Sequence, residues 1–230
     1  MSDDRVLWIT GASAGIGAAT ARLAAASGWR LVLAARSLDK LTALADELGG
    51  DDRAIAVECD VTSWDDQQAA LTVALEHFGR LDAAWANAGY GGARSFLGET
   101  PEFWRGMVLT NVYGVALTIR AAIPALKESR GHLLLTGSVA GRRAIPGSLY
   151  SATKHAVHAM AESARQELNG TGVRLTVVAP GIVDTEFFSK VPLDDPLHAD
   201  DVARAVLYAL EQPSHVDVSE IVIRPTAQEN

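Results

Sequence analysis

The sequence has few of the features that mark secreted, nucleic-acid-binding or membrane proteins. Its single cysteine, Cys59, cannot form an intramolecular disulfide, so we expect a reducing compartment. The formal net charge is −8, and acidic and basic residues are interspersed without a run of one sign. This pattern argues against nucleic-acid or anionic-membrane binding. No apolar stretch approaches the roughly 20 residues of a membrane span, and the acidic N-terminus does not resemble a signal peptide. We therefore expect a cytoplasmic protein.

The chain does contain a regular alternation of short apolar runs and helix-forming segments. Its 230 residues, 48% of them hydrophobic, are enough for one sizeable core, and we find no repeat, low-complexity tract or linker. Strands are predicted at residues 6–10, 30–35, 54–58, 81–86, 132–136, 173–178 and 221–223. Helices are predicted at 18–26, 37–48, 63–78, 101–128 and 150–168, and from about 200. The pattern predicts a single α/β domain over residues 1–230, a doubly wound Rossmann fold with a mostly parallel seven-stranded sheet and helices on both faces.

Two segments depart from the regular pattern. Pro124 predicts a distortion within the long helix 101–128. Residues 186–199 form the longest irregular stretch, with two prolines and the aromatic side chains of Phe187 and Phe188. We expect this stretch to form a lid or wall on the substrate side of a site.

A glycine-rich turn follows the first predicted strand. Gly11, Gly15 and Gly17 allow a tight turn and a close approach of the backbone to a ligand. The helix that follows offers its N-terminal amides to a pyrophosphate. No Gly-Lys-Ser/Thr follows, which argues against an ATPase or kinase. The turn predicts nucleotide binding; an ordinary turn with small residues for packing is the alternative.

The end of the second strand bears on the choice of nucleotide. A site selective for NAD(H) usually has a carboxylate there to hold the ribose diol, and this chain has none. Arg36, with Ser37 beside it, can instead accept a 2′-phosphate. We therefore favour NADP(H) over NAD(H), although Arg36 could simply be a solvated residue at a strand end.

Tyr150 and Lys154 lie one helical turn apart, on one face of a predicted helix. A free tyrosine titrates near 10 and is a poor acid or base at neutral pH. We expect the Lys154 charge to favour the phenolate and to lower the pKa of Tyr150. The same spacing also occurs on solvated helix faces, so its meaning depends on its surroundings.

Together these motifs resemble the short-chain dehydrogenase/reductase family, over residues 6–223. The glycine turn, Asn87-Ala88-Gly89 after the fourth strand, and Pro180-Gly181 with Thr185 after the sixth match family motifs. Asn111, Ser138, Tyr150 and Lys154 match its catalytic tetrad. The C-terminal residues 218–228 also resemble the branch that contains NADP-dependent serine and 3-hydroxy-acid dehydrogenases.

The resemblance implies a reversible hydride transfer between NADP(H) and a small alcohol/carbonyl substrate. Tyr150 would act as the general acid/base, and Lys154 would tune it and hold the nicotinamide ribose. Ser138 would bind the substrate oxygen, and Asn111 would hold a water linking Lys154 to solvent. The implied cofactor-binding residues are Gly11, Ser13, Ala14, Gly15, Ile16, Gly17, Arg36, Ser37, Asp60, Val61, Asn87, Ala88, Gly89, Tyr150, Lys154, Pro180, Gly181, Val183 and Thr185.

Within that set, the resemblance implies that Asp60 and Val61 border the adenine, and that residues 87–89 line the adenosine side. Residues 180–185 would lie near the nicotinamide. It also implies a homo-oligomer, a tetramer or a dimer. Cys59, beside Asp60, is expected to be a small buried hydrophobe rather than a redox group.

Other chemistries find less support in the sequence. The six histidines form no His-x-x-x-His pair, so no metal site is expected. The glycines around Ser138 do not have the spacing of a nucleophile elbow, which disfavours a serine hydrolase. A sugar epimerase or dehydratase usually has a longer chain and another glycine spacing. A non-catalytic dinucleotide-binding sensor or subunit on the same fold stays an alternative.

The substrate itself is left open. Arg142 and Arg143, close after Ser138, could hold a carboxylate, and Tyr90 and Arg94 could approach from the other side. Each of these four side chains could equally be a solvated surface residue. A hydrophobic ketone would instead use Phe187, Phe188 and Ile145.

Overall fold

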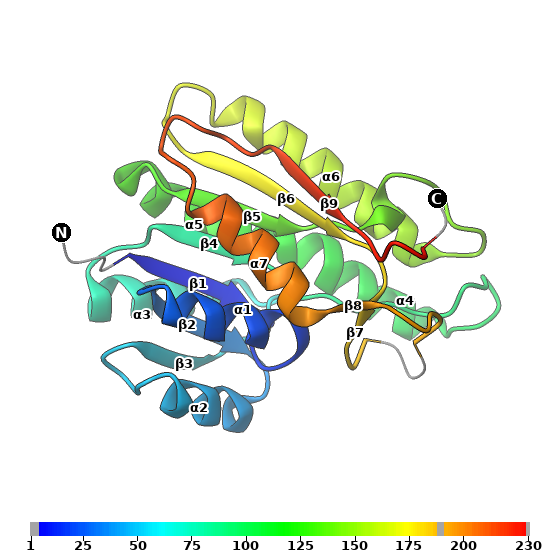
Figure 1. Cartoon of the computed structure of the whole chain (residues 1–230), viewed down its shortest axis with the longest axis horizontal. Helices are drawn as coiled ribbons and strands as arrows, with labels where there is room; N and C mark the ends of the chain where they lie inside the picture. The colour runs from blue at the N-terminus through cyan, green and yellow to red at the C-terminus, as the bar shows by residue number, and fades with distance from the viewer. Residues whose placement is uncertain (1–4, 188–190, 229–230) are drawn as a thin grey trace.

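The computed structural model describes residues 5–187 and 191–228, so Phe188 lies outside the described residues (Figure 1). Seven parallel strands form one sheet in the order β3-β2-β1-β4-β5-β6-β9. The strands are β1 (Val6–Thr10), β2 (Arg30–Ala35), β3 (Ala54–Glu58), β4 (Ala83–Ala86), β5 (His132–Thr136), β6 (Arg174–Pro180) and β9 (Glu220–Ile223). The order reverses between β1 and β4, which confirms the predicted doubly wound Rossmann fold in a single domain.

Helices cover both faces of the sheet (Figure 1). They are α1 (Gly15–Ala26), α2 (Leu38–Glu47), α3 (Trp64–Phe78), α4 (Pro101–Val108), α5 (Val115–Ser129), α6 (Leu149–Glu167) and α7 (Ala199–Leu210). One core lies between the sheet and helices α3, α5 and α6, and the other between the sheet and α1, α2 and α7. The central strands are buried on both faces, which is why they are continuous apolar runs in the sequence.

The fourth strand begins two residues later than predicted, because Asp82 has a different task. Its carboxylate accepts a hydrogen bond from the backbone N–H of Val6 at 2.8 Å and pairs with Arg80 at 2.6 Å. Asp82 therefore fixes the start of β1 rather than extending β4. The sixth strand is longer than predicted and includes Pro180 at its carboxyl end, where β9 is its neighbour.

The long helix changes its hydrogen bonding in the middle rather than at its proline. Residues Leu109–Gly114 form a π-helix between α4 and α5, whereas α5 continues through Pro124. The predicted distortion was therefore misplaced. The combined helix Pro101–Ser129 is long and apolar enough to cross a membrane by length and composition alone, contrary to the expectation that no segment reaches that length. In the fold its apolar side chains pack against the sheet, as those of a core helix do.

The predicted irregular stretch 186–199 contains an element that the sequence pattern did not indicate. A two-residue strand β8 (Leu197–His198) pairs in parallel with β7 (Val183–Asp184), just after β6. Each strand is too short for an alternating pattern to be visible. This small sheet holds Leu197 and His198 beside Val183 and Asp184, which follow the carboxyl end of β6.

Candidate functional site

The predicted site residues gather at the carboxyl edge of the sheet, near the point where the strand order reverses. The glycine turn follows β1, Arg36 follows β2, Asp60 follows β3, Asn87 follows β4 and Ser138 follows β5. Open α/β sheets bind ligands along this edge, outside the carboxyl ends of their strands. Helix α6 brings Tyr150 and Lys154 to the same edge, beside the end of β5.

The glycine turn has a backbone that only glycine fits. Gly11 and Gly15 have φ values of +68° and +54°. A Cβ added at Gly17 would lie 2.3 Å from the Gly11 carbonyl oxygen, so no side chain is tolerated there. Ala14 occupies the N-cap position of α1, so no side chain bonds to the first amides of the helix. The first turn also contains no acidic residue. The uncapped amide end of α1 thus suits the phosphates of a dinucleotide.

Ser13, Ala14 and Ile16 of this turn are partly exposed. Thr185 closes the turn from the opposite side, since its Cγ2 lies 3.4 Å from the position of a Cβ at Gly15. Val183, two residues earlier, is buried within β7. The segment after β6 therefore lies over the glycine turn, where a bound pyrophosphate would be enclosed.

Asn87 is fully used in holding the glycine turn. Its Nδ2 donates to the carbonyl oxygens of Thr10 and Gly11 at 3.0 and 3.3 Å, and its Oδ1 accepts from Thr136 Oγ1 at 3.1 Å. The backbone N–H groups of Asn87 and Ala88 both donate to Thr10 Oγ1. The side chain of Asn87 is thus a brace between β1, β4 and β5, a task that its place in the sequence did not reveal.

At the far end of the edge, Arg36 is exposed and Ser37 caps α2 without a side-chain hydrogen bond. The positive charge of Arg36 is close enough to oppose the rise that burial causes in the pKa of Tyr90. Asp60 Oδ1 accepts from the N–H and hydroxyl of Thr62 at 2.9 and 2.8 Å, which fixes the turn after β3. Val61 is buried in the core below this turn.

Cys59, next to Asp60, is buried in the core, and burial raises the pKa of its thiol to about 12. Cys59 is therefore a small buried side chain of the core, as the sequence predicted. Among the described residues, no group of three or more His, Cys, Asp or Glu side chains is arranged to hold a metal ion.

Tyr150 and Lys154 do lie together, with the Lys154 Nζ 5.7 Å from the centroid of the Tyr150 ring. However, burial raises the pKa of Tyr150 to about 12 and lowers the pKa of Lys154 to about 8. The expected lowering of the Tyr150 pKa is therefore not seen, because the loss of hydration outweighs the one opposing effect, a hydrogen bond with Ser138. Lys154 donates to the carbonyl oxygen of Thr136 at 2.7 Å, and this bond fixes its ammonium group at the end of β5.

Ser138 contacts both Tyr150 and the carboxyl end of β6. Its hydroxyl bonds with the Tyr150 side chain, and this hydrogen bond acts to lower the pKa of the phenol. Ser138 Oγ also accepts from Ala140 N at 3.1 Å and lies 3.4 Å from the Pro180 carbonyl oxygen. Ser138, Tyr150 and Lys154 thus form one connected cluster of a hydroxyl, a phenol and an amine.

Asn111 is buried within the π-helix, one layer behind this cluster. Its Nδ2 donates to Tyr90 O at 2.8 Å and to Thr153 Oγ1 at 3.2 Å, and its Oδ1 accepts from Tyr90 N at 3.0 Å. The π-helix turns this side chain toward the loop after β4. A Cβ on Gly89 would lie 3.1 Å from Asn111 Oδ1 and 3.7 Å from Lys154 Nζ, so glycine keeps the gap between them clear.

Aromatic side chains form the outer wall. Phe187 meets Tyr150 edge-on, with 5.4 Å between ring centroids, and its ring covers Gly91. The Tyr90 ring packs against Phe103, and its hydroxyl faces Gly106 of α4. Arg142, considered above as a carboxylate ligand, forms an ion pair of 2.5 Å with Glu220 instead. Of the two arginines that follow Ser138, Arg142 is therefore already paired with a carboxylate of the protein itself.

Gln228, near the C-terminus, supports the turn after β6. Its Oε1 accepts from the N–H of Ile182 at 2.8 Å and lies over Gly181, where a Cβ would come within 2.2 Å of it. Sequence reasoning missed this residue, because Gln228 and Gly181 are far apart in the chain and neither forms a recognisable motif with the other.

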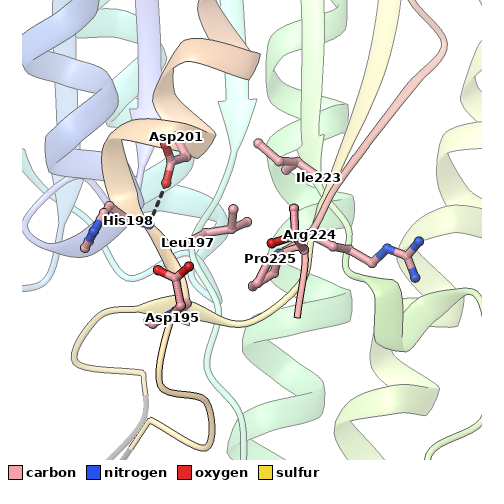
Figure 2. Close-up of a pocket in the computed structure, with 9 residues that line it drawn as sticks. Asp195, Leu197, His198, Asp201, Ile223, Arg224 and Pro225 are labelled. Carbon is pink, nitrogen blue, oxygen red and sulfur yellow. Dashed lines mark hydrogen bonds between the residues drawn. The ribbon is translucent and has the colours of Figure 1, made fainter. Parts of the chain in front are cut away.

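A cavity of about 380 Å³ lies beside the site, between the start of α7 and the C-terminal segment (Figure 2). Figure 2 shows that the imidazole ring of His198 and the guanidinium group of Arg224 point away from each other. The carboxylate of Asp201 accepts a hydrogen bond from the backbone N–H of His198. The polar groups do not converge on one point. We therefore assign the chemistry to the cluster around Tyr150 and not to this cavity.

Comparison with known proteins identifies the family. Residues 5–195 match the family model described as short chain dehydrogenase. The chain therefore belongs to the short-chain dehydrogenases, oxidoreductases whose fold binds a nicotinamide dinucleotide.

Individual relatives agree with this assignment. An uncharacterized oxidoreductase of Staphylococcus aureus (strain MW2) is 38% identical over 226 residues, which cover 96% of this chain and 97% of the relative. An alcohol dehydrogenase of the archaeon Thermococcus sibiricus, solved with 5-hydroxy-NADP, is 34% identical with a TM-score of 0.91 and covers 99% of each chain. Serine dehydrogenase of Escherichia coli is 29% identical with a TM-score of 0.88, over 98% of this chain and all (100%) of its own.

Proposed function

We propose that the protein is an NADP(H)-dependent oxidoreductase acting on the CH–OH group of a small alcohol or on the corresponding carbonyl compound. The observation that carries this proposal is the connected cluster of Ser138, Tyr150 and Lys154 beside a glycine turn that fits a dinucleotide. A protein that only bound a dinucleotide would need the turn, but not a buried lysine held beside a tyrosine.

The residues of the cluster have separate tasks in this mechanism. When bound, the nicotinamide supplies or accepts the hydride. Tyr150 gives its hydroxyl proton to the carbonyl oxygen in the reducing direction, and its phenolate removes the hydroxyl proton of the alcohol in the oxidising direction. Ser138 donates a hydrogen bond to the same substrate oxygen, where negative charge develops. The hydrogen bond with Ser138 favours the phenolate form of Tyr150 against the effect of burial. The ammonium of Lys154, 5.7 Å from the ring centroid, would act in the same direction.

Arg36 supports a preference for NADP(H). It is exposed at the end of β2, where a carboxylate would favour the ribose diol of NAD(H). Its guanidinium can accept a 2′-phosphate through two parallel hydrogen bonds, with the Ser37 hydroxyl beside it. The complex of the Thermococcus sibiricus relative contains a derivative of NADP, which agrees with this choice.

The remaining parts of the proposal rest on composition for the location and the irregular stretch, and on the family resemblance for the rest. We assign the protein to the cytoplasm and to a homo-oligomer, a tetramer or a dimer. Residues 186–199 would border the substrate, since Phe187 already lies against Tyr150. The roles of Asp60 and Val61 near the adenine, and of Pro180, Gly181, Val183 and Thr185 near the nicotinamide, belong to the same proposal.

The test replaces Tyr150 with phenylalanine, with the exposed Tyr208→Phe as a matched control. Turnover of serine, 3-hydroxybutyrate, 2,3-butanediol and acetophenone is followed by the absorbance of NADPH. We expect Tyr150→Phe to lower kcat by about 10²- to 10⁴-fold, the usual contribution of a general acid or base. NADPH binding and the control should be unchanged. Retained turnover in Tyr150→Phe would contradict the mechanism, and NADPH binding without turnover of any compound by the unmodified protein would favour the non-catalytic alternative.

A further inference from the structure

Behind Ser138 lies a histidine that the proposed mechanism does not use. His158 stands one helical turn after Lys154 on α6, on the same face of the helix. Its ring packs against the backbone around Ser138: a Cβ on Gly137 would lie 2.7 Å from His158 Nε2, and one on Gly141 would lie 2.6 Å from its Cδ2. Glycines at both positions therefore make room for the imidazole.

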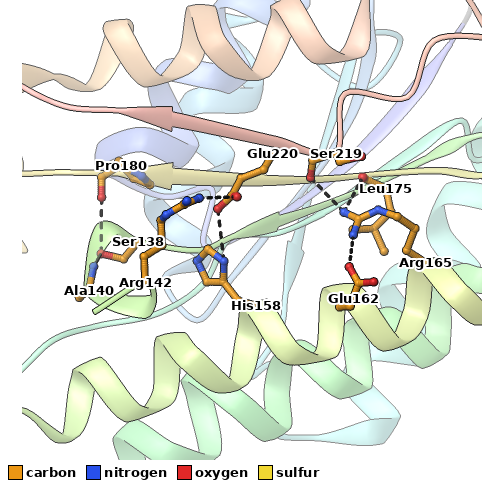
Figure 3. Close-up of polar contacts among 10 residues, drawn as sticks. All are labelled: Ser138, Ala140, Arg142, His158, Glu162, Arg165, Leu175, Pro180, Ser219 and Glu220. Atoms are coloured by element: carbon orange, nitrogen blue, oxygen red, sulfur yellow. Dashed lines mark hydrogen bonds and ion pairs between the residues drawn. The ribbon is translucent and has the colours of Figure 1, made fainter. Parts of the chain in front are cut away.

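His158 is the first member of a chain of three polar side chains, His158, Glu220 and Arg142 (Figure 3). Its Nδ1 lies 3.3 Å from Glu220 Oε1, and Glu220 Oε2 lies 2.5 Å from Arg142 Nη1. Glu220 begins β9 and is the register partner of Val177 on β6. One carboxylate thus joins α6, the last strand of the sheet and the segment after β5.

The turn that presents Ser138 is in contact with His158 and is followed directly by Arg142. Ser138 caps the single 3-10 turn Val139–Gly141 through the hydrogen bond from Ala140 N, and Arg142 follows directly. His158 fixes the backbone near the start of this turn, and Arg142 fixes its end.

We propose that Glu220 is a positioning residue, which holds Ser138 in its catalytic orientation through His158 and Arg142. This inference rests on the proposed function, in which Ser138 donates to the substrate oxygen. Glu220 and Arg142 are 31% and 49% exposed, so their ion pair contributes little to stability. Loss of the carboxylate should therefore act on the reaction more than on folding.

Burial and the neighbouring groups together decide the protonation state of His158. Burial lowers the pKa of His158, and the nearby positive charges of Arg142 and Lys154 act in the same direction, while Glu220 and a hydrogen bond to the Ser138 backbone oppose them. His158 is therefore neutral at pH 7 and above, with the proton on Nδ1 when it donates to Glu220. At this pH the link between His158 and Glu220 is a hydrogen bond rather than an ion pair.

The experiment compares Glu220→Gln with the control Glu162→Gln. Glu162 is also paired with an arginine, Arg165, and this pair lies on α6, away from Ser138 (Figure 3). The readout is kcat, the KM for NADP and the pH profile of alcohol oxidation, with whichever of the four compounds named above has the highest turnover. Removing an oxyanion donor outright lowers kcat by about 10²- to 10³-fold, so misorienting Ser138 should cost less, about five- to twentyfold. The KM for NADP should not change, and Glu162→Gln should behave as the unmodified protein.

The pH profile and a double variant separate positioning from general damage. Because the Ser138 hydrogen bond acts to lower the pKa of Tyr150, Glu220→Gln should move the inflection of alcohol oxidation to higher pH. In a Ser138→Ala background, Glu220→Gln should have less than about a twofold further effect. An unshifted inflection, or an equal loss in both backgrounds, would overturn the proposal. If Tyr150→Phe is inactive while Glu220→Gln is normal, only this inference fails; if Tyr150→Phe is active, the proposed function fails first.

Discussion

Replacing Asn111 with alanine tests what the buried amide of the π-helix does for the fold. In the structure this side chain holds both backbone groups of Tyr90, by hydrogen bonds of 3.0 and 2.8 Å, and bonds to Thr153 at 3.2 Å. Tyr90 begins the loop 90–100, which leads from β4 to the long helix. Asn111→Ala would leave the N–H and C=O of Tyr90 without their partners.

The size of the effect follows from those bonds. An unsatisfied, partly buried polar group costs about 1–3 kcal/mol, and water can reach the half-buried Tyr90 in part. We therefore expect the free energy of unfolding to fall by about 2–4 kcal/mol. For a chain of this size, 1 kcal/mol corresponds to about 2–4 °C in Tm, so Tm should fall by about 4–16 °C.

Thermal unfolding and limited proteolysis measure this effect. The same substitution at the exposed Asn169 is the matched control and should change the free energy of unfolding by less than about 0.5 kcal/mol. Proteolytic cleavage of Asn111→Ala should increase within residues 90–100 before other regions. A fall in Tm of less than 2 °C would refute the reasoning, because it would mean that Tyr90 does not depend on Asn111.

Two further changes test other parts of the molecule. Arg36→Asp should weaken NADPH binding at least about tenfold more than NADH binding, because it removes a phosphate ligand and adds a repelling charge. Fluorescence titrations measure both affinities, and equal losses for both would show that Arg36 is not at the 2′-phosphate. Burial lowers the pKa of His132 to about 3, so the unfolded chain binds a proton below its ordinary value of 6.5 while the folded chain does not. His132 therefore contributes to the loss of stability as pH falls from about 6.5 toward 3, and His132→Gln should reduce the difference between denaturation midpoints at pH 7 and pH 5, whereas the exposed His215→Gln should leave it unchanged.

The fold could be predicted because its main strands and helices are long enough, and buried enough, to give clear apolar patterns in the sequence. Strands such as β1 and β5 are apolar throughout, and the helices between them have enough residues to be recognised. The predicted element bounds are wrong where a single side chain or a very short strand determines the local structure. Asp82 ends the apolar run before β4, and the pairing of β7 with β8 involves two residues on each side. Periodicity carries no information over so few residues.

The candidate site was predictable in its positions but not in its energetics. Gly17, Ser138 and Tyr150 are each found at a strand end or a helix start, and the parallel sheet brings these points together. The direction of the pKa change at Tyr150 depends on burial, which the spacing to Lys154 does not reveal. Contacts between distant segments, such as that of Glu220 with His158, were also invisible in the sequence.

The opposite pKa changes of Tyr150 and Lys154 have one cause, since burial favours the uncharged phenol and the uncharged amine alike. In the proposed mechanism the phenolate of Tyr150 forms in one direction and reacts in the other, so fixed groups must stabilise the charged forms. Two such groups come from the carboxyl end of β5: the Thr136 carbonyl accepts from the ammonium of Lys154, and the Ser138 hydroxyl bonds to the Tyr150 phenol. Gly137 between them leaves the space that His158 fills. The end of β5, rather than the tyrosine–lysine spacing alone, therefore sets the acid–base properties of the pair.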